Sequence, residues 1–155
     1  MKKILIALDY DPTAQKVAEA GYDLAKSMNA KITLLHVISD PVYYSDVEYS
    51  PVMGFTGYME MGQLKSVTAE RLTDASFHYL EKIRSYLGDD SIDIRVEEGD
   101  FANSILQTAM DIKADTIVMG TLSRKWLENM LMGSVAEKVL HHTTIPLYIV
   151  PTKKK

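Results

Sequence analysis

The sequence predicts an α/β protein built on a doubly wound, five-stranded parallel sheet. The first observation is that short apolar runs alternate with stretches of helical periodicity, in the order β-α-β-α-β-α-β-α-β. Strands that alternate with helices form parallel sheets with right-handed crossovers and helices on both faces. The second is the length of 155 residues, which corresponds to one domain. The third is a composition of 46% hydrophobic and 25% charged residues, ordinary for a globular protein.

Five segments have the pattern of strands. Ile4–Leu8 and Ile32–Ile38 are continuous apolar runs, typical of strands buried on both faces. Residues 92–96 alternate between apolar and charged side chains, which indicates a half-exposed edge strand. Thr116–Met119 and Pro146–Val150 complete the predicted sheet.

Four segments have helical spacing. In the first, Asp11 and Pro12 supply a cap and a first helical residue, and the inner face is Ala14, Val17, Ala18, Gly21, Leu24, Ala25 and Met28. A long helix follows over residues 63–87. Asp100 is positioned to cap the third, whose expected inner face is Ala102, Ile105, Leu106, Ala109 and Met110. The fourth is Ser134–His142.

Residues 39–62 show no clear period. This segment of 24 residues exceeds the roughly 12–15 that are usual for structureless loops in compact domains. It contains several tyrosines and methionines, which suit an adaptable contact surface. Two interpretations stay open: a contact surface or lid, and an excursion that packs on its own domain.

Residues 117–136 combine a strand, a polar basic loop and a glycine-led helix start. The strand stops at Gly120, and Gly133 and Ser134 open the next helix. Such an arrangement presents backbone N–H groups and a positive helix end to a phosphate. Asp9 and Val37 also lie at carboxyl ends of predicted strands, where parallel sheets bind their ligands. The sequence therefore predicts a phosphate-bearing ligand in the crevice at these strand ends.

The chain is similar to the universal stress protein family over nearly its whole length. The resemblance is carried by the segments Ile4–Asp9, Leu34–Val37, Glu98–Asp100, Ala114–Gly120, Gly133–Leu140 and Ile145–Val150. It implies a Rossmann-like fold of the adenine nucleotide alpha hydrolase type, with strand order 3-2-1-4-5. We expect a single domain over residues 1–151, followed by a basic tail at 152–155.

The family's nucleotide-binding members carry the pattern G-x-x-G-x9-G-S/T. Gly120, Gly133 and Ser134 fit this pattern, whereas Ser123 replaces the second glycine. A left-handed serine costs on the order of 1–2 kcal/mol, enough to weaken binding about tenfold. A hydroxyl donated to a phosphate would offset that strain, and a Cβ in the phosphate path would abolish binding. The family also contains a class that lacks the motif and binds no ATP, so these outcomes stay open.

The resemblance and the strand ends together define a set of candidate binding residues. Asp9 is expected to accept hydrogen bonds from adenine or ribose, and Val37 to line the adenine pocket. Arg124 and Lys125 are expected to offset phosphate charge, and Ser134 to act both as N-cap and phosphate ligand. The full set is Ala7, Asp9, Val37, Met119, Gly120, Ser123, Arg124, Lys125, Gly133, Ser134 and Val135.

Composition excludes several classes of protein. The chain has no cysteine, which rules out disulfides and thiol chemistry and fits a cytoplasmic protein. A net charge of −4 argues against nucleic-acid binding through a basic surface. No apolar run approaches the roughly 20 residues of a membrane span, and we expect no signal peptide. His36 is expected to be a strand residue near the crevice rather than a metal ligand.

The leading functional hypothesis is a stress-response regulatory protein that binds ATP or AMP, with Mg²⁺ at the phosphates as a further candidate. No nucleophile elbow, P-loop or HExxH motif occurs, so we expect no catalytic residue and at most slow ATP hydrolysis. The alternatives are a family member that binds no nucleotide and acts as an interaction module, and a weak phosphohydrolase or binder of another small ligand. The apolar strand at residues 146–150 is expected to lie at a sheet edge and to pair in a homodimer. A protein partner is expected, of unknown identity.

Overall fold

A computed structural model describes residues 1–9, 13–38, 61–121 and 133–152. The chain alternates strands and helices in the predicted order. The elements are β1 (Lys3–Ala7), α1 (Ala14–Met28), β2 (Lys31–Ile38), α2 (Met61–Leu87), β3 (Asp93–Glu98), α3 (Phe101–Asp111), β4 (Thr116–Gly120), α4 (Ser134–His142) and β5 (Leu147–Val150).

The strands form one parallel sheet with the order β3-β2-β1-β4-β5, which confirms the predicted topology. β1 lies in the middle, with Ile6 paired to Leu34 of β2 on one side and to Val118 of β4 on the other. β3 and β5 are the edges, as predicted. The order of the strands therefore reverses at β1 and β4, which places a crevice between them at their carboxyl ends.

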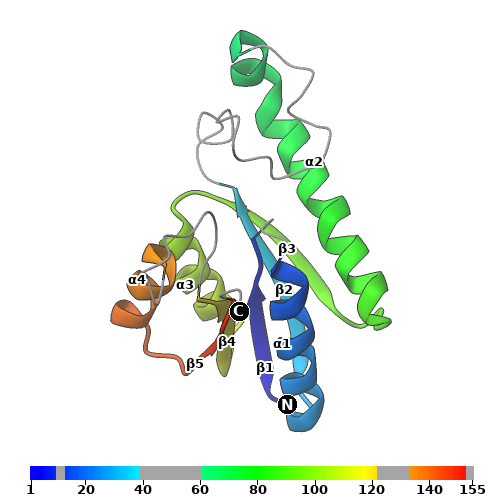
Figure 1. Cartoon of the computed structure of the whole chain (residues 1–155), viewed down its shortest axis with the longest axis vertical. Helices are drawn as coiled ribbons and strands as arrows, with labels where there is room; N and C mark the ends of the chain where they lie inside the picture. The colour runs from blue at the N-terminus through cyan, green and yellow to red at the C-terminus, as the bar shows by residue number, and fades with distance from the viewer. Residues whose placement is uncertain (10–12, 39–60, 122–132, 153–155) are drawn as a thin grey trace.

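Two hydrophobic layers cover the two faces of the sheet. Along β1 the side chains alternate, so that Ile4 and Ile6 pack with α1 and α2 while Leu5 packs with α3 and α4. Figure 1 shows α1 and α2 on one side of the sheet and α3 and α4 on the other. β1 and β2 are buried on both faces, which explains their uninterrupted apolar sequences.

Three helices end on a residue with positive φ. Asn29 follows α1 with φ of 52°, Gly88 follows α2 with φ of 71°, and Lys113 lies just after α3 with φ of 56°. At Asn29 and Lys113 the next amide donates back to a carbonyl in the last turn, the hydrogen-bond pattern of a Schellman motif. Asn29 and Gly88 are residues that tolerate this conformation, whereas Lys113 adopts it at a steric cost.

Several element details differ from the expectation. α1 begins at Ala14 after Thr13, whose side chain makes no capping hydrogen bond, and Asp11 and Pro12 lie outside the described residues. α2 begins at Met61, so the last two residues of the expected 39–62 loop are helical and the remainder lies outside the described part. Met110 was assigned to the inner face of α3 but is 64% exposed, because it lies about 140° around the helix from Ile105.

The first residue of the expected tail, Thr152, contacts the end of β4. Thr152 is 6% exposed, and its amide donates to Oγ1 of Thr121 at 3.1 Å. The two threonine hydroxyls are also 3.0 Å apart. Thr152 is therefore buried against Thr121. Within the described ranges, no helix combines the length and apolar character needed to cross a bilayer.

Candidate functional site

A pocket opens at the carboxyl ends of β1, β2 and β4. Its volume is about 550 Å³, counting space open to solvent. The lining residues come from six elements and the segment between β1 and α1: Ala7, Leu8, Asp9, Thr13, Ala14, Val17, Leu35, His36, Val37, Phe101, Ile105, Met119, Gly120 and Val135.

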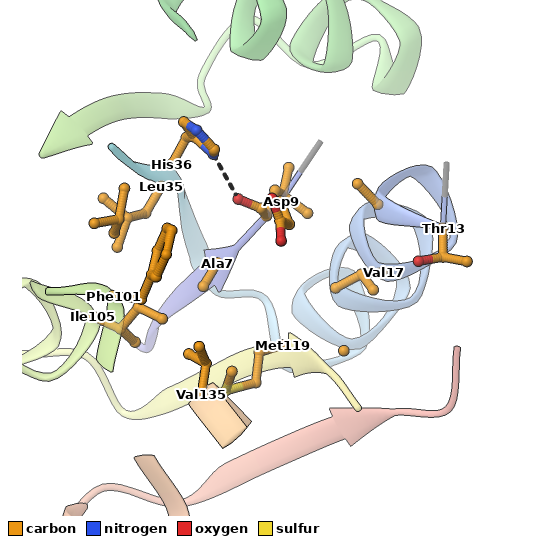
Figure 2. Close-up of a pocket in the computed structure, with 14 residues that line it drawn as sticks. Ala7, Asp9, Thr13, Val17, Leu35, His36, Phe101, Ile105, Met119 and Val135 are labelled. Atoms are coloured by element: carbon orange, nitrogen blue, oxygen red, sulfur yellow. Dashed lines mark hydrogen bonds between the residues drawn. The ribbon is translucent and has the colours of Figure 1, made fainter. Parts of the chain in front are cut away.

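The position of this pocket follows from the topology. The chain leaves β1 toward α1 on one face of the sheet, and it leaves β4 toward α4 on the other face. Because neighbouring connections diverge, they leave an open crevice between them. Figure 2 shows Val17 and Thr13 of the α1 side facing Phe101 and Ile105 of α3, with Ala7 between them.

The walls of the pocket are mainly apolar. Val17, Ile105 and Met119 are buried, and the half-buried ring of Phe101 adds an aromatic surface at the first residue of α3. The polar groups in the lining are few, with Asp9 at the end of β1 as the carboxylate. A mainly apolar lining with a few polar groups is typical of small-molecule sites.

His36 is held in one tautomer beneath the pocket. Its Nδ1 lies 2.9 Å from the carbonyl oxygen of Leu8, and a carbonyl can only accept, so Nδ1 carries the proton. Burial lowers the pKa of His36 to about 4, although the hydrogen bond to Leu8 opposes part of that shift. The imidazole is therefore neutral at physiological pH, which makes it a donor at Nδ1 and an acceptor at Nε2.

Tyr79 of α2 contacts Asp9, the residue that follows Leu8. Its hydroxyl donates to the backbone oxygen of Asp9 at 2.8 Å. The rings of Tyr79 and His36 meet edge to face, with centroids 6.4 Å apart and an interplanar angle of 76°. Two consecutive carbonyls after β1 are thus each bonded by a side chain from another element.

The helices α3 and α4 differ in how their N-termini are capped. The carboxylate of Asp100 caps α3 by accepting from the amide of Asn103 at 3.0 Å, as predicted, and it also bonds Nζ of Lys138 at 3.1 Å. The Asn103 amide is the main reason that the pKa of Asp100 is lowered. α4 begins after Gly133, which provides no side-chain cap. The start of α3 is therefore neutralised by its own carboxylate, whereas within the described part of the chain no side chain caps the first amides of α4.

Thr121 joins the end of β4 to the start of α4. Its amide donates to Val150 O at 3.0 Å, and its carbonyl accepts from the amide of Gly133. The residues on either side of segment 122–132, which lies outside the described residues, are therefore hydrogen-bonded to each other. This contact places the first turn of α4 beside the carboxyl end of β4, and Val135 in that turn lines the pocket.

The structure brings six of the predicted site residues into one pocket lining: Ala7, Asp9, Val37, Met119, Gly120 and Val135. Gly133 and Ser134 lie directly before Val135 at the start of α4. Ser123, Arg124 and Lys125 lie outside the described residues.

The expectation that Ser134 is the N-cap of its helix is wrong. The amide of Glu137 donates to Gly133 O at 3.0 Å, which closes the first helical turn on Gly133. Gly133 has the extended conformation of an N-cap (φ −73°, ψ 162°), and Ser134 is the first helical residue. The backbone conformation at position 133 therefore does not by itself require glycine.

Sequence reasoning did not include several lining residues in the site. Thr13, Ala14 and Val17 belong to the first turns of α1, and Phe101 and Ile105 to the first turns of α3. Helical periodicity assigned most of these positions to the core, and only their nearness to a strand end could have marked them as lining. His36 was expected near the crevice, and it does line the pocket. Among the described residues, no group of three or more metal-ligating side chains could hold a metal ion.

The chain is similar to known proteins over nearly its whole length. The model of the universal stress protein family matches residues 1–151. Universal stress protein MJ0531 of Methanocaldococcus jannaschii is 31% identical, over 99% of this chain and 84% of that protein. Stress response protein NhaX of Bacillus subtilis is 30% identical, over 96% of each chain.

Solved structures show the same fold. The structure of protein MJ0577 superposes with a TM-score of 0.76 at 24% identity, covering 99% of this chain and 98% of that chain. A universal stress protein in complex with cAMP superposes with a TM-score of 0.67 at 16% identity, and the match covers 98% of each chain. The chain belongs to the universal stress protein family.

Proposed function

We propose that this protein binds an adenine nucleotide, ATP or AMP, in the pocket between β1 and β4 and acts as a stress-response regulatory protein. The observation that carries the proposal is the pairing of an apolar slot with an uncapped helix start. The base would occupy the apolar pocket and the phosphates would lie at the start of α4. These two features adjoin at Val135. A relative of the same fold is described in complex with cAMP, which also carries an adenine base.

In this proposal each part of the nucleotide has its own partner. The base lies against Phe101, Ile105 and Met119, and Asp9 accepts hydrogen bonds from the base or ribose. The phosphates lie at the amides of Ser134 and Val135, where the helix dipole favours negative charge. Ser123, Arg124, Lys125 and any Mg²⁺ would act at the phosphates. The described residues offer no metal cluster of their own, so the phosphates would supply most of the ligands to that ion.

The regulatory role would operate through a homodimer. β5 is a sheet edge, and Tyr148 within it is 43% exposed. An apolar edge strand pairs readily with a second copy about a two-fold axis. We expect sedimentation equilibrium to give a dimer for the native chain and a monomer for Tyr148→Lys. A native monomer at tens of micromolar would contradict this part of the proposal.

Nucleotide binding is tested first by mass spectrometry of small molecules released from freshly purified protein, followed by calorimetry with ATP, AMP, adenosine and GTP. We expect bound adenine nucleotide or a measurable heat with ATP and AMP, and weaker binding of GTP. Asp9→Ala should weaken ATP and AMP about tenfold to a hundredfold, because a hydrogen bond to a charged group contributes about 1.5–3 kcal/mol. Asp23→Ala removes an exposed carboxylate from α1 and should leave affinity unchanged.

An empty protein that also gives no heat with added nucleotide would overturn the proposal. The alternative would then be an interaction module, and the dimer measurement would remain meaningful. Replacing Ser123 with glycine separates two further cases. Tighter binding in Ser123→Gly means that the serine strains the phosphate loop, and equal binding means that glycine is not required there.

A further inference from the structure

The two residues that follow β1 are held by side chains rather than by the sheet alone. Pairing of β1 with β4 extends to Ile6 and Val118, and pairing with β2 extends to Ala7 and Leu35. Beyond that point the amide of Leu8 donates to Leu35 O at 2.8 Å. The carbonyls of Leu8 and Asp9 then accept from His36 and Tyr79, at 2.9 Å and 2.8 Å.

These two contacts come from different elements and support each other. His36 belongs to β2 and is buried, while Tyr79 belongs to α2 and is half-buried. Their rings are in edge-to-face contact, which favours one orientation of each. Since His36 is neutral with its proton on Nδ1, it donates to Leu8 O throughout the physiological pH range.

The orientation of the Asp9 side chain depends on the peptide planes around it. The orientation of the Asp9 carbonyl sets ψ of Asp9, and the side-chain rotamers that a residue can adopt depend on its φ and ψ. The hydrogen bond from the Tyr79 hydroxyl holds this carbonyl in one orientation. Groups that bind a ligand must be held within about 0.5 Å of their productive position by such surrounding contacts.

We propose that Tyr79 is a positioning residue of the nucleotide site, which acts through the backbone of Asp9 to direct its carboxylate toward the ligand. The inference rests on the proposed function, in which Asp9 contacts the base or ribose. It also links α2 to the pocket: a nucleotide held by Asp9 and the docking of Tyr79 must stabilise each other equally, because coupling between two binding events is reciprocal.

The test replaces Tyr79 with phenylalanine, which keeps the ring and removes only the hydroxyl. Tyr86→Phe is the matched control, because Tyr86 lies on the same helix and its hydroxyl bonds a surface carboxylate, Glu19, at 3.0 Å. In calorimetry with AMP, we expect Tyr79→Phe to raise Kd about fivefold, the effect of one neutral hydrogen bond of about 1 kcal/mol. Tyr86→Phe should leave Kd unchanged.

A double-mutant cycle separates positioning from a general loss of structure. If Tyr79 acts through Asp9, the fivefold effect should disappear when Tyr79→Phe is made in the Asp9→Ala background. Reciprocal coupling adds a second measurement: AMP should slow amide exchange in α2 around Tyr79 in the native protein and less so in Tyr79→Phe.

Each failure has a distinct signature. If the native protein binds AMP and Tyr79→Phe binds it equally well, the positioning role is wrong while the proposed function stands. If the fivefold loss persists in the Asp9→Ala background, Tyr79 acts by another route and the inference is again wrong. If the native protein binds no adenine nucleotide at all, the proposed function fails and this inference falls with it.

Discussion

Gly21 of α1 leaves no room for a side chain above Ile6 of β1. A Cβ built on Gly21 would lie 2.6 Å from Cδ1 and 2.9 Å from Cγ1 of Ile6, and 3.2 Å from Cγ1 of Val118. Ile6 is fully buried, so it has little space into which to move. The glycine thus allows α1 to approach the two central strands closely, directly behind the pocket.

Gly21→Ala should destabilise the protein even though alanine is the better helix former. The gain in helix propensity is about 1 kcal/mol, and overpacking a filled core costs about 1–3 kcal/mol. We expect a net loss of up to about 2 kcal/mol in the free energy of unfolding, measured by urea denaturation. Ile6→Val removes the nearest atom, so the double variant should lose less than the sum of the two single variants. Strict additivity would show that the contact is not limiting.

His36 should make the stability of the protein fall as the pH is lowered from about 6.5 toward 4. His36 has a pKa near 6.5 when unfolded and about 4 when folded, so the unfolded state binds more protons between these values. The contribution of the neutral His36 to stability is therefore fully present above pH 6.5 and is lost as the pH falls toward 4. The loss amounts to about 2 kcal/mol between pH 7 and pH 5.

His36→Gln tests this assignment, because an amide can still donate to Leu8 O but does not titrate in this range. Denaturation at pH 7 and pH 5 should give a difference about 2 kcal/mol smaller in the variant than in the native chain. The exposed histidines are shared by both proteins and cancel in this comparison. Equal pH dependence would rule out His36 as the source.

Asp100 should stabilise the start of α3 mainly as a cap. Asp100→Ala is expected to cost about 1 kcal/mol at pH 7, the usual value for a lost N-cap. Asp100→Asn keeps an acceptor for the Asn103 amide and should cost less, although it loses the charge facing Lys138. Because the folded pKa of Asp100 lies below 3.8, its extra stabilisation is present above that pH and is lost below it. Denaturation at pH 7 and pH 3 should show this loss only in the native chain.

The start of α4 offers a substitution with opposite effects on stability and on binding. Ser134→Asp places a negative charge in the first turn, which should stabilise the free protein by about 0.3–1 kcal/mol. The same charge should repel nucleotide phosphates and weaken ATP at least about tenfold, a loss of about 1.4 kcal/mol. Adenosine, which has no phosphate, should bind as before. Ser134→Ala is the control for loss of the hydroxyl, and equal losses for ATP and adenosine would place the phosphates elsewhere.

Lys113→Gly should raise stability by about 1 kcal/mol. The left-handed conformation at φ of 56° is strained for lysine, which has a Cβ, and is unstrained for glycine. Asn29→Gly, at φ of 52°, should change stability less, since asparagine tolerates this region. Thermal unfolding of both variants makes the comparison. A loss of stability in Lys113→Gly would mean that the lysine side chain contributes more than its backbone costs.

Much of the fold could be predicted because burial on both faces leaves a clear pattern. The apolar runs of β1 and β2, the charged alternation of β3 and the cap at Asp100 each follow from local physics, and each is confirmed. The inner face of α3 was predicted less well, because Met110 was assigned to the wrong side of the helix. Met110 is apolar but exposed, and the buried position nearby is occupied by Thr108.

The sequence by itself determined the order of the elements and the strand ends at which Asp9, Val37 and Gly120 lie, because periodicity and strand termini are local properties. Only the tertiary structure decided which side chains from other elements contact these residues and the strand that leads to Asp9. The hydroxyl of Tyr79 contacts Asp9 across 70 residues of chain, and Gly21 lies against Ile6 at a separation that a single Cβ would close. Contacts of this kind depend on how the helices pack on the sheet, and no local spacing encodes that packing.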